Sequence, residues 1–135
     1  MDIKRLSAGT VAGGVTYFLL GWVIYKLLLG DFMAANSTLT IKDPPDFVMM
    51  LISQLALAAV LALVFTRWAG ISTLAGGAQA GAMLGFLMAM NVSFDFYGFS
   101  TAFTLNATLL EPVIGAIRGA VAGGMIGVVL GKMGA

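Results

Sequence analysis

Five ionisable residues stand inside or beside long apolar segments of this 135-residue chain, where a charge is costly and therefore informative. Arg118 falls near the middle of the last apolar segment, and Glu111 precedes it by seven residues. On a helix this spacing places both side chains on nearly the same face, two turns apart. Because helical side chains lean toward the helix N-terminus, Arg118 is expected to reach toward Glu111 or toward acids of neighbouring helices. The full set is Lys26, Asp31, Asp95, Glu111 and Arg118.

Two interpretations of these charges remain open. In the first, they are buried ion pairs that fix the register of packed helices and bind no ligand. In the second, they form one polar cavity in the outer half of a helix bundle, which binds a small ion or polar solute or relays protons. The side chains of Gln54, Asn91 and Asn106 could add hydrogen bonds to that cluster.

Cysteine and histidine are both missing from the sequence. Their absence excludes disulfides, iron–sulfur clusters, zinc sites built on thiolate or imidazole, and catalytic groups that need either residue. The nine methionines occupy apolar positions, where helix packing is favoured over metal or haem ligation. We therefore expect no enzyme activity, no metal and no cofactor. A net charge of +1 gives no reason to expect nucleic acid as a partner.

The composition predicts an all-α integral membrane protein. Hydrophobic residues make up 60% of the chain and charged residues only 10%, whereas soluble domains carry about 25% charged residues. A small globule cannot bury that much apolar surface, so the lipid bilayer is the expected solvent. Runs of about 20 apolar residues are long enough to cross the hydrocarbon core. They predict one transmembrane domain, 1–135, with helices at about 6–29, 47–66, 71–92 and 109–130.

Basic residues predict the orientation of these helices. Lys4 and Arg5 precede the first helix, Arg67 lies in the short second connection, and Lys132 follows the last helix. All four fall on one side, and the opposite side carries mainly acidic residues. The positive-inside rule then places both termini in the cytoplasm. The first apolar run is too long for a signal peptide, so we expect it to be retained.

The two halves of the sequence resemble each other. TVAGG at 10–14 matches TLAGG at 73–77, and acidic residues and basic helix ends then fall in the same register. A duplicated helical hairpin, spanning 10–68 and 73–133, explains the matches better than a shared Gly/Ala-rich composition does. Because both copies begin on the same side of the membrane, they are expected to be parallel repeats.

Glycine recurs at every fourth position of the last helix and again in the third. Residues four apart lie on one helical face, and bare backbone lets a second helix approach closely where lipid supplies no hydrophobic drive. Such glycine-zipper rows predict helix packing, within the four-helix bundle by default or between subunits as the alternative. The glycines concerned are Gly77, Gly81, Gly85, Gly115, Gly119, Gly123, Gly127 and Gly131.

Aromatic residues gather in the connection NVSFDFYGFSTAFTLNAT, which the sequence places between the third and fourth helices. Aromatic side chains at headgroup depth usually anchor a protein at the membrane interface, and this role is favoured here over a ligand-binding lid. Trp22 and Tyr25 near the outer end of the first helix are expected to belong to the same outer belt, and Trp68 to the inner one.

Several segments carry a family resemblance that covers nearly the whole chain: GGVTYFLLGW, GDFMAAN, AGG-x-x-AG in the third helix, and FDFYG. With the glycine-rich last helix, they resemble an uncharacterised, domain-of-unknown-function type family of small four-helix bacterial membrane proteins. The resemblance implies four helices and a bacterial inner (cytoplasmic) membrane. It carries over no activity and no site residue.

Two functions are expected from the sequence. The first is a non-enzymatic membrane protein that acts through helix–helix association, as a homo-oligomer or as an accessory subunit of a larger complex with other membrane subunits. The glycine rows and the lack of catalytic residue types favour it. The alternative is a small transporter or channel component with a polar site near Arg118, Glu111 and Asp95.

Overall fold

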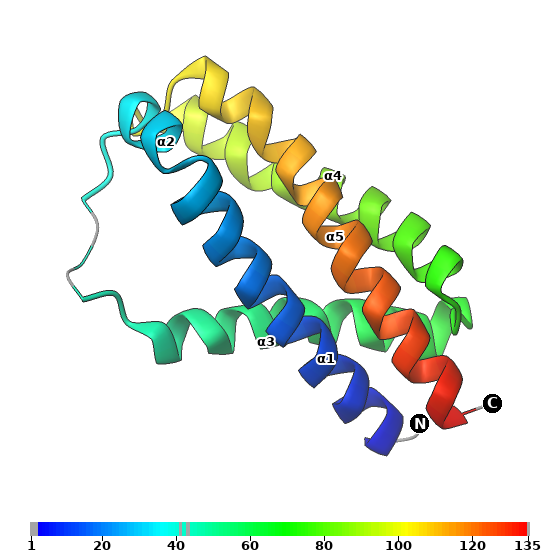
Figure 1. Ribbon diagram of the computed structural model, residues 1–135. Coiled ribbons are helices and arrows are strands. Elements are labelled where there is room, and N and C mark those ends of the chain that lie inside the picture. The colour runs from blue at the N-terminus through cyan, green and yellow to red at the C-terminus, as the bar shows by residue number, and fades with distance from the viewer. Residues whose placement is uncertain (1–2, 41, 43, 135) are drawn as a thin grey trace.

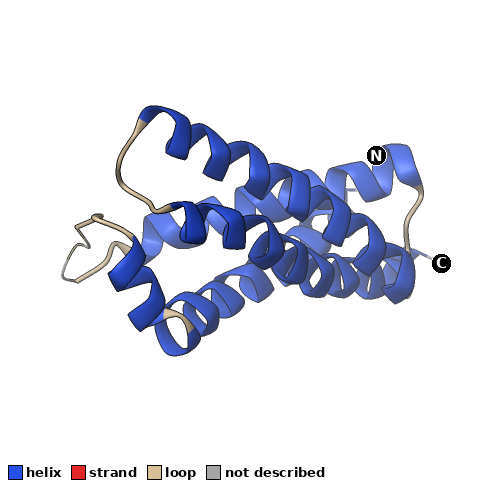
Figure 2. Ribbon diagram, turned by 90° about the horizontal axis from the view of Figure 1, so that it is seen from above, coloured by secondary structure: helices blue, strands red, loops and turns tan. Residues whose placement is uncertain are grey.

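Helices form nearly all of the chain in the computed structural model, which describes residues 3–40, 42 and 44–134. Two of the helices end in a π-helical turn, labelled η (Figures 1 and 2). In chain order the elements are α1 (Ile3–Trp22), η1 (Val23–Leu28), α2 (Gly30–Asn36), α3 (Phe47–Leu63), η2 (Val64–Ala69), α4 (Leu74–Phe99) and α5 (Leu105–Gly134).

Four of these helical segments are long and apolar enough to cross a membrane, which confirms the expected all-α architecture with four candidate membrane helices. Each segment has at least 23 residues, and about 20 residues suffice to cross the hydrocarbon core. The four segments are Ile3–Leu28, Phe47–Ala69, Leu74–Phe99 and Leu105–Met133.

The helix boundaries differ most from the sequence expectation at the α4–α5 connection and in the connection between the first two long helices. The third membrane helix continues to Phe99 and the last begins at Leu105, so most of the aromatic stretch is helical and the connection is short. No proline interrupts residues 93–99, and α4 stops only where Ser100 adopts extended backbone angles. Part of the stretch between the expected helices 6–29 and 47–66 is also helical, as α2, and the Asn36 side chain donates a 2.8 Å hydrogen bond to the Phe32 carbonyl.

Polar side chains cap the starts of α3 and α4. Asp46 accepts a hydrogen bond from the Met49 amide at 3.1 Å, and Thr73 accepts one from the Gly76 amide at 3.0 Å. These contacts satisfy amides that have no partner inside the helix. Between η2 and α4 the chain reverses at Gly70, whose φ of 62° lies in the left-handed region that favours glycine.

The four long helices pack side by side in the order α4, α5, α1, α3, and the described residues of α3 and α4 share no extensive interface. Both termini lie at one end of the molecule (Figure 1). The apolar core sits toward that end, whereas α3 diverges from α1 toward the other end (Figures 1 and 2). The buried core residues are Tyr17, Ala58, Leu61, Ala62, Phe65, Ala122, Ile126 and Leu130.

The two glycine rows face each other along the α4–α5 contact. A Cβ atom added at Gly81 would clash with the backbone carbonyl of Gly119. The same holds for the pairs Gly77 with Gly123 and Gly85 with Gly115, while Gly127 and Gly131 meet the carbonyls of Thr73 and Ser72. The contacts of the eight predicted packing glycines are therefore made within one chain, where they bring the backbone of α5 against that of α4 and of the residues just before it.

At the end opposite the termini, the segment after α2 is hydrogen-bonded to the connection between α4 and α5. Ser37 pairs with Phe103 in a single β-bridge. The Thr38 amide donates to the Ala102 carbonyl at 2.8 Å, and the Thr104 amide donates to the Asn36 carbonyl at 2.9 Å. These bonds join α2 to the start of α5, and so hold the segment that borders the gap between α1 and α3.

Candidate functional site

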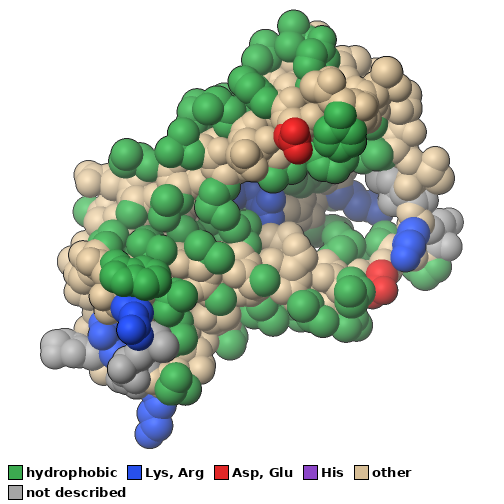
Figure 3. Space-filling model, turned by 180° about the vertical axis from the view of Figure 1, so that it is seen from behind, with side chains coloured by type: hydrophobic (Ala, Val, Ile, Leu, Met, Phe, Trp, Pro, Cys, Tyr) green, Lys and Arg blue, Asp and Glu red, His purple; other side chains and the backbone are tan. Residues whose placement is uncertain are grey.

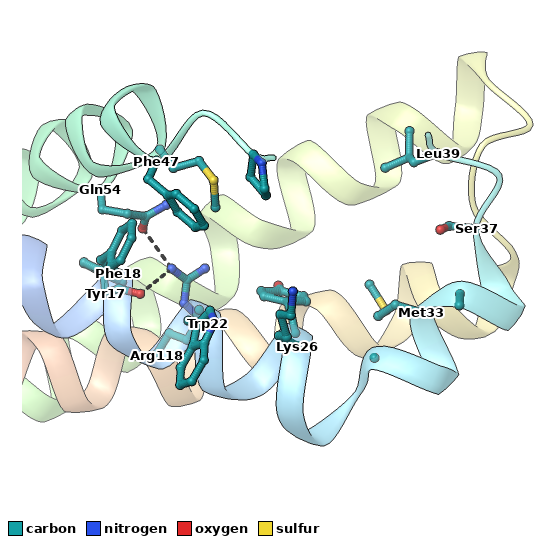
Figure 4. Close-up of a pocket in the computed structure, with 16 residues that line it drawn as sticks. Tyr17, Phe18, Trp22, Lys26, Met33, Ser37, Leu39, Phe47, Gln54 and Arg118 are labelled. Atoms are coloured by element: carbon teal, nitrogen blue, oxygen red, sulfur yellow. Dashed lines mark hydrogen bonds between the residues drawn. The ribbon is translucent and has the colours of Figure 1, made fainter. Parts of the chain in front are cut away.

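A cavity of about 770 Å³ lies between the diverging halves of α1 and α3. Arg118, Tyr17 and Gln54 stand at its inner end, and Ser37 and Leu39 lie at the opposite end (Figure 4). In the space-filling view, basic side chains are visible inside a hollow on one face of the molecule (Figure 3). The other described residues that line the cavity are Phe18, Gly21, Trp22, Tyr25, Lys26, Gly30, Met33, Ala34, Pro45, Phe47 and Met50.

Arg118 reaches from α5 into this cavity and is held by neutral groups. Its Nη2 atom donates to the backbone carbonyl of Tyr17 at 2.9 Å and to Oε1 of Gln54 at 2.8 Å. Its Nε atom is buried and has no hydrogen-bond partner among the described residues. The guanidinium is thus fixed on one side by α1 and α3, and its positive charge is not cancelled by those contacts.

The face of α1 and η1 that receives Arg118 has a simple sequence pattern, Tyr17, Gly21 and Tyr25, each four residues apart. The guanidinium carbon lies 5.3 Å from the ring centre of Tyr17 and 5.8 Å from that of Tyr25, within cation–π range. Gly21 leaves room between them, since a Cβ there would come within 3.1 Å of Arg118 Nη2. The four-residue spacing of Tyr17, Gly21 and Tyr25 is the feature of the sequence that could have indicated the face of α1 that receives Arg118.

Glu111 does not form an ion pair with Arg118 among the described residues. Instead its Oε2 atom accepts a 2.8 Å hydrogen bond from the hydroxyl of Tyr25. The tyrosine therefore stands between the two charges, with its hydroxyl on the acid and its ring beside the guanidinium. This arrangement differs from the direct reach of Arg118 toward Glu111 that the helical spacing suggested.

The remaining three charges of the predicted cluster separate in the structure. Lys26 lines the cavity from η1. Asp31 on α2 and Asp95 on α4 are both exposed, and neither is among the described residues that line the cavity. Because the helix of Asp95 packs mainly against α5, on the side away from α3, its carboxylate is not brought to Arg118.

From the sequence, Gln54 is expected only to add hydrogen bonds to the charged cluster, and Tyr25 and Trp22 are expected in an interfacial belt. In the structure, Gln54 is a direct partner of Arg118, Tyr25 binds Glu111, and Trp22 lines the cavity. The packing of α1, α3 and α5 against one another decides these contacts, and a sequence pattern does not give that packing.

The arrangement is suited to binding. Arg118 is the 14th residue of a 29-residue membrane segment, and an arginine at such a central position costs about 2.5–3.5 kcal/mol on insertion scales. A cavity of this size matches those that hold small molecules, which are mostly apolar with a few polar groups that orient the ligand. Among the described residues, no group of three or more acidic side chains could hold a metal ion.

No protein-family model matches the chain, and neither a curated protein nor a solved structure matches it.

Proposed function

We propose that this chain is a non-enzymatic integral membrane protein that binds a small solute in the cavity between α1 and α3, as a small transporter or solute-binding component. The observation that carries the proposal is the guanidinium of Arg118, which faces a 770 Å³ cavity from the middle of a membrane span. Ionisable residues inside a span are costly, and where they face a cavity they usually mark a substrate or ion pathway.

The competing interpretation, that the charges are ion pairs fixing helix register, has less support. Arg118 makes its hydrogen bonds to a backbone carbonyl and an amide, and the carboxylate of Glu111 is taken up by a tyrosine hydroxyl. A register-fixing pair would bring opposite charges together, whereas here Tyr25 separates them. A residual charge that faces open space is what a binding site requires.

The proposed setting is the inner membrane of a bacterium, with both termini in the cytoplasm. Support comes from the four basic residues on the side of the termini and from the family resemblance stated above. The cavity mouth at Ser37 and Leu39 would then face the outer side. The solute would enter from there toward Arg118.

A duplicated hairpin is proposed as the origin of this architecture. Within the first half of the chain α1 packs on α3, and within the second half α4 packs on α5. This pairing is what two fused copies of one helical hairpin would produce. The cavity would be a feature of the first copy, because the glycine rows close the corresponding space between α4 and α5.

Self-association, or association with other membrane subunits, is a second candidate function. The glycine rows are occupied within the chain, so such a contact would use another surface. Gln79 and Asn91 on α4 are exposed, and their side chains make no hydrogen bond to the described residues. Amide side chains in lipid gain from bonding across helices. If association depends on them, Gln79→Leu with Asn91→Leu lowers the oligomeric mass in detergent, and an unchanged mass contradicts it.

Cysteine labelling tests the solute cavity directly, because the chain has no cysteine of its own. Phe18 lines the cavity, while the neighbouring Leu19 is 54% exposed and does not. The two positions lie at the same depth on α1. A membrane-impermeant thiol reagent should label Phe18→Cys from the outer side and leave Leu19→Cys unlabelled, because thiols react as thiolates and need water.

Two controls complete this experiment. Ser37→Cys at the mouth should be labelled from the same side, which verifies the reagent and the orientation. Labelling of both variants after denaturation verifies that each thiol is intact. Equal labelling of Phe18→Cys and Leu19→Cys in the native protein would contradict a water-accessible cavity.

A further inference from the structure

The charged side chains facing the cavity are of one sign. Among the described residues that line it, the charged ones are Lys26 and Arg118. Glu111 is not one of the lining residues, and its carboxylate accepts the hydrogen bond of Tyr25. A cation in this space would meet two like charges, whereas an anion would meet two opposite ones. The field therefore favours an anion.

The guanidinium of Arg118 is positioned to bind a ligand in the cavity as well as to hold α1 and α3 together. Its Nη2 atom makes both hydrogen bonds, to Tyr17 and Gln54. Its Nη1 atom makes none to the described residues, and the group lies at the inner end of the cavity (Figure 4). The N–H groups of Nη1 are therefore available to a ligand without reorganisation, which lowers the cost of binding, whereas Nε is buried. A carboxylate oxygen can accept a charge-assisted hydrogen bond from Nη1, which is stronger than a bond between neutral groups.

Apolar side chains make up most of the rest of the lining. Phe18, Trp22 and Phe47 contribute aromatic rings and Met33 a flexible thioether (Figure 4). Met50 also lines the cavity with a thioether. A small inorganic anion would leave this surface without a partner. A molecule with an apolar body would bury it, and methionine adapts to varied apolar shapes.

We propose that the ligand is an organic monocarboxylate, with its carboxylate on Arg118 and its apolar body against Phe18, Trp22 and Met50. This inference rests on the proposed solute cavity and names its substrate class. Lys26 assists by attracting the anion into the cavity. The ligand comes either from water as a short-chain acid or from the bilayer as a fatty acid through the gap between α1 and α3.

Tryptophan fluorescence provides a direct test. The chain has two tryptophans, and Trp68 is 68% exposed and outside the cavity lining. Trp68→Phe therefore leaves Trp22 as a single reporter inside the site. In zwitterionic nanodiscs, octanoate should change the Trp22 emission in a saturable way. Octylammonium, with the same chain and the opposite charge, should bind at least tenfold more weakly, and acetate should give no saturable change.

Arg118→Gln in the same background should weaken octanoate binding at least tenfold, while Arg118→Lys, which keeps the charge but cannot hold Tyr17 and Gln54 and still present a second nitrogen to the ligand, should give an intermediate loss. Circular dichroism and elution volume check that the variants fold. If the Arg118 variants do not fold, the same binding measurement on Lys26→Gln tests the proposal instead, because this exposed side chain can change without disturbing the core. It should weaken octanoate and strengthen octylammonium.

Equal affinity for octanoate and octylammonium, or unchanged octanoate binding in a folded Arg118→Gln protein, would overturn the proposal. Palmitate in the nanodisc distinguishes the two sources: competition with octanoate supports a bilayer source, and lack of competition with retained octanoate binding supports a water-borne acid. Failure here is separable from failure of the cavity itself. If Phe18→Cys is labelled but octylammonium binds equally well, the cavity stands and the anion assignment fails.

Discussion

Tyr25 and Glu111 are joined by a 2.8 Å hydrogen bond between hydroxyl and carboxylate, although 86 residues separate them in the sequence. The bond connects the π-helical turn η1 to α5. It also places the tyrosine ring 5.8 Å from the Arg118 guanidinium carbon. The Tyr25 side chain therefore donates a hydrogen bond to Glu111 and packs beside Arg118, which leaves the guanidinium available to the cavity.

Removing that hydroxyl should destabilise the protein. In Tyr25→Phe the half-buried carboxylate of Glu111 loses its donor, and an unsatisfied buried group of this kind costs about 1–3 kcal/mol. Thermal unfolding in detergent, followed by circular dichroism, measures the change. Tyr97→Phe is the matched control, because Tyr97 is exposed on α4 and its hydroxyl has no hydrogen-bond partner among the described residues. Equal shifts for both variants would show that the Tyr25 bond contributes nothing.

The glycine contact between α4 and α5 should not tolerate a single methyl group. Gly81→Ala places a Cβ against the Gly119 carbonyl, and such overpacking costs about 1–3 kcal/mol or more. Gly98→Ala in the same helix meets no atom within 4 Å, so it should be neutral or stabilise the helix by up to about 1 kcal/mol. The free energies of unfolding of the two variants provide the comparison. A harmless Gly81→Ala would mean that the helices are not in backbone contact.

Gly21 should control ligand binding more than folding. A methyl group there would come within 3.1 Å of Arg118 Nη2, the movable end of a long side chain, so the guanidinium shifts while the helix stays intact. Octanoate binding to Gly21→Ala should fall about tenfold, since a hydrogen bond to a charged group contributes about 1.5 kcal/mol or more. In Gly30→Ala the new methyl has only an ordinary contact of 3.8 Å, so binding should persist. Equal binding by both variants would contradict this geometry.

Membrane topology can be tested with reporter fusions in a bacterial host. A fluorescent protein fused after the last residue should fluoresce, and alkaline phosphatase at that place should be inactive, because the positive-inside rule predicts that this end lies in the cytoplasm. Alkaline phosphatase inserted after Thr40 should be active. The reverse pattern would place the cavity mouth on the cytoplasmic side.

The sequence by itself predicted four helices that are long and apolar enough to cross a membrane, and the structure has them. Apolar runs of spanning length require helical structure in lipid, since every backbone amide and carbonyl must be satisfied within its own segment. It also identified Arg118 as a charge that needs an explanation, and the glycine rows as packing surfaces. The predicted end of α4 and the predicted start of α5 were less accurate, because the aromatic residues before Phe99 continue a helix as readily as they form a connection.

Tertiary structure alone decided which residues meet. The helical spacing of Glu111 and Arg118 brought them onto neighbouring positions of one helix, but Tyr25 from another helix came between them. Gln54 became a partner of Arg118 because α3 crosses α1 at an angle that opens toward its N-terminal end. That crossing also creates the cavity. Crossing angles depend on how side chains of several helices interdigitate, and this property belongs to no single segment of the sequence.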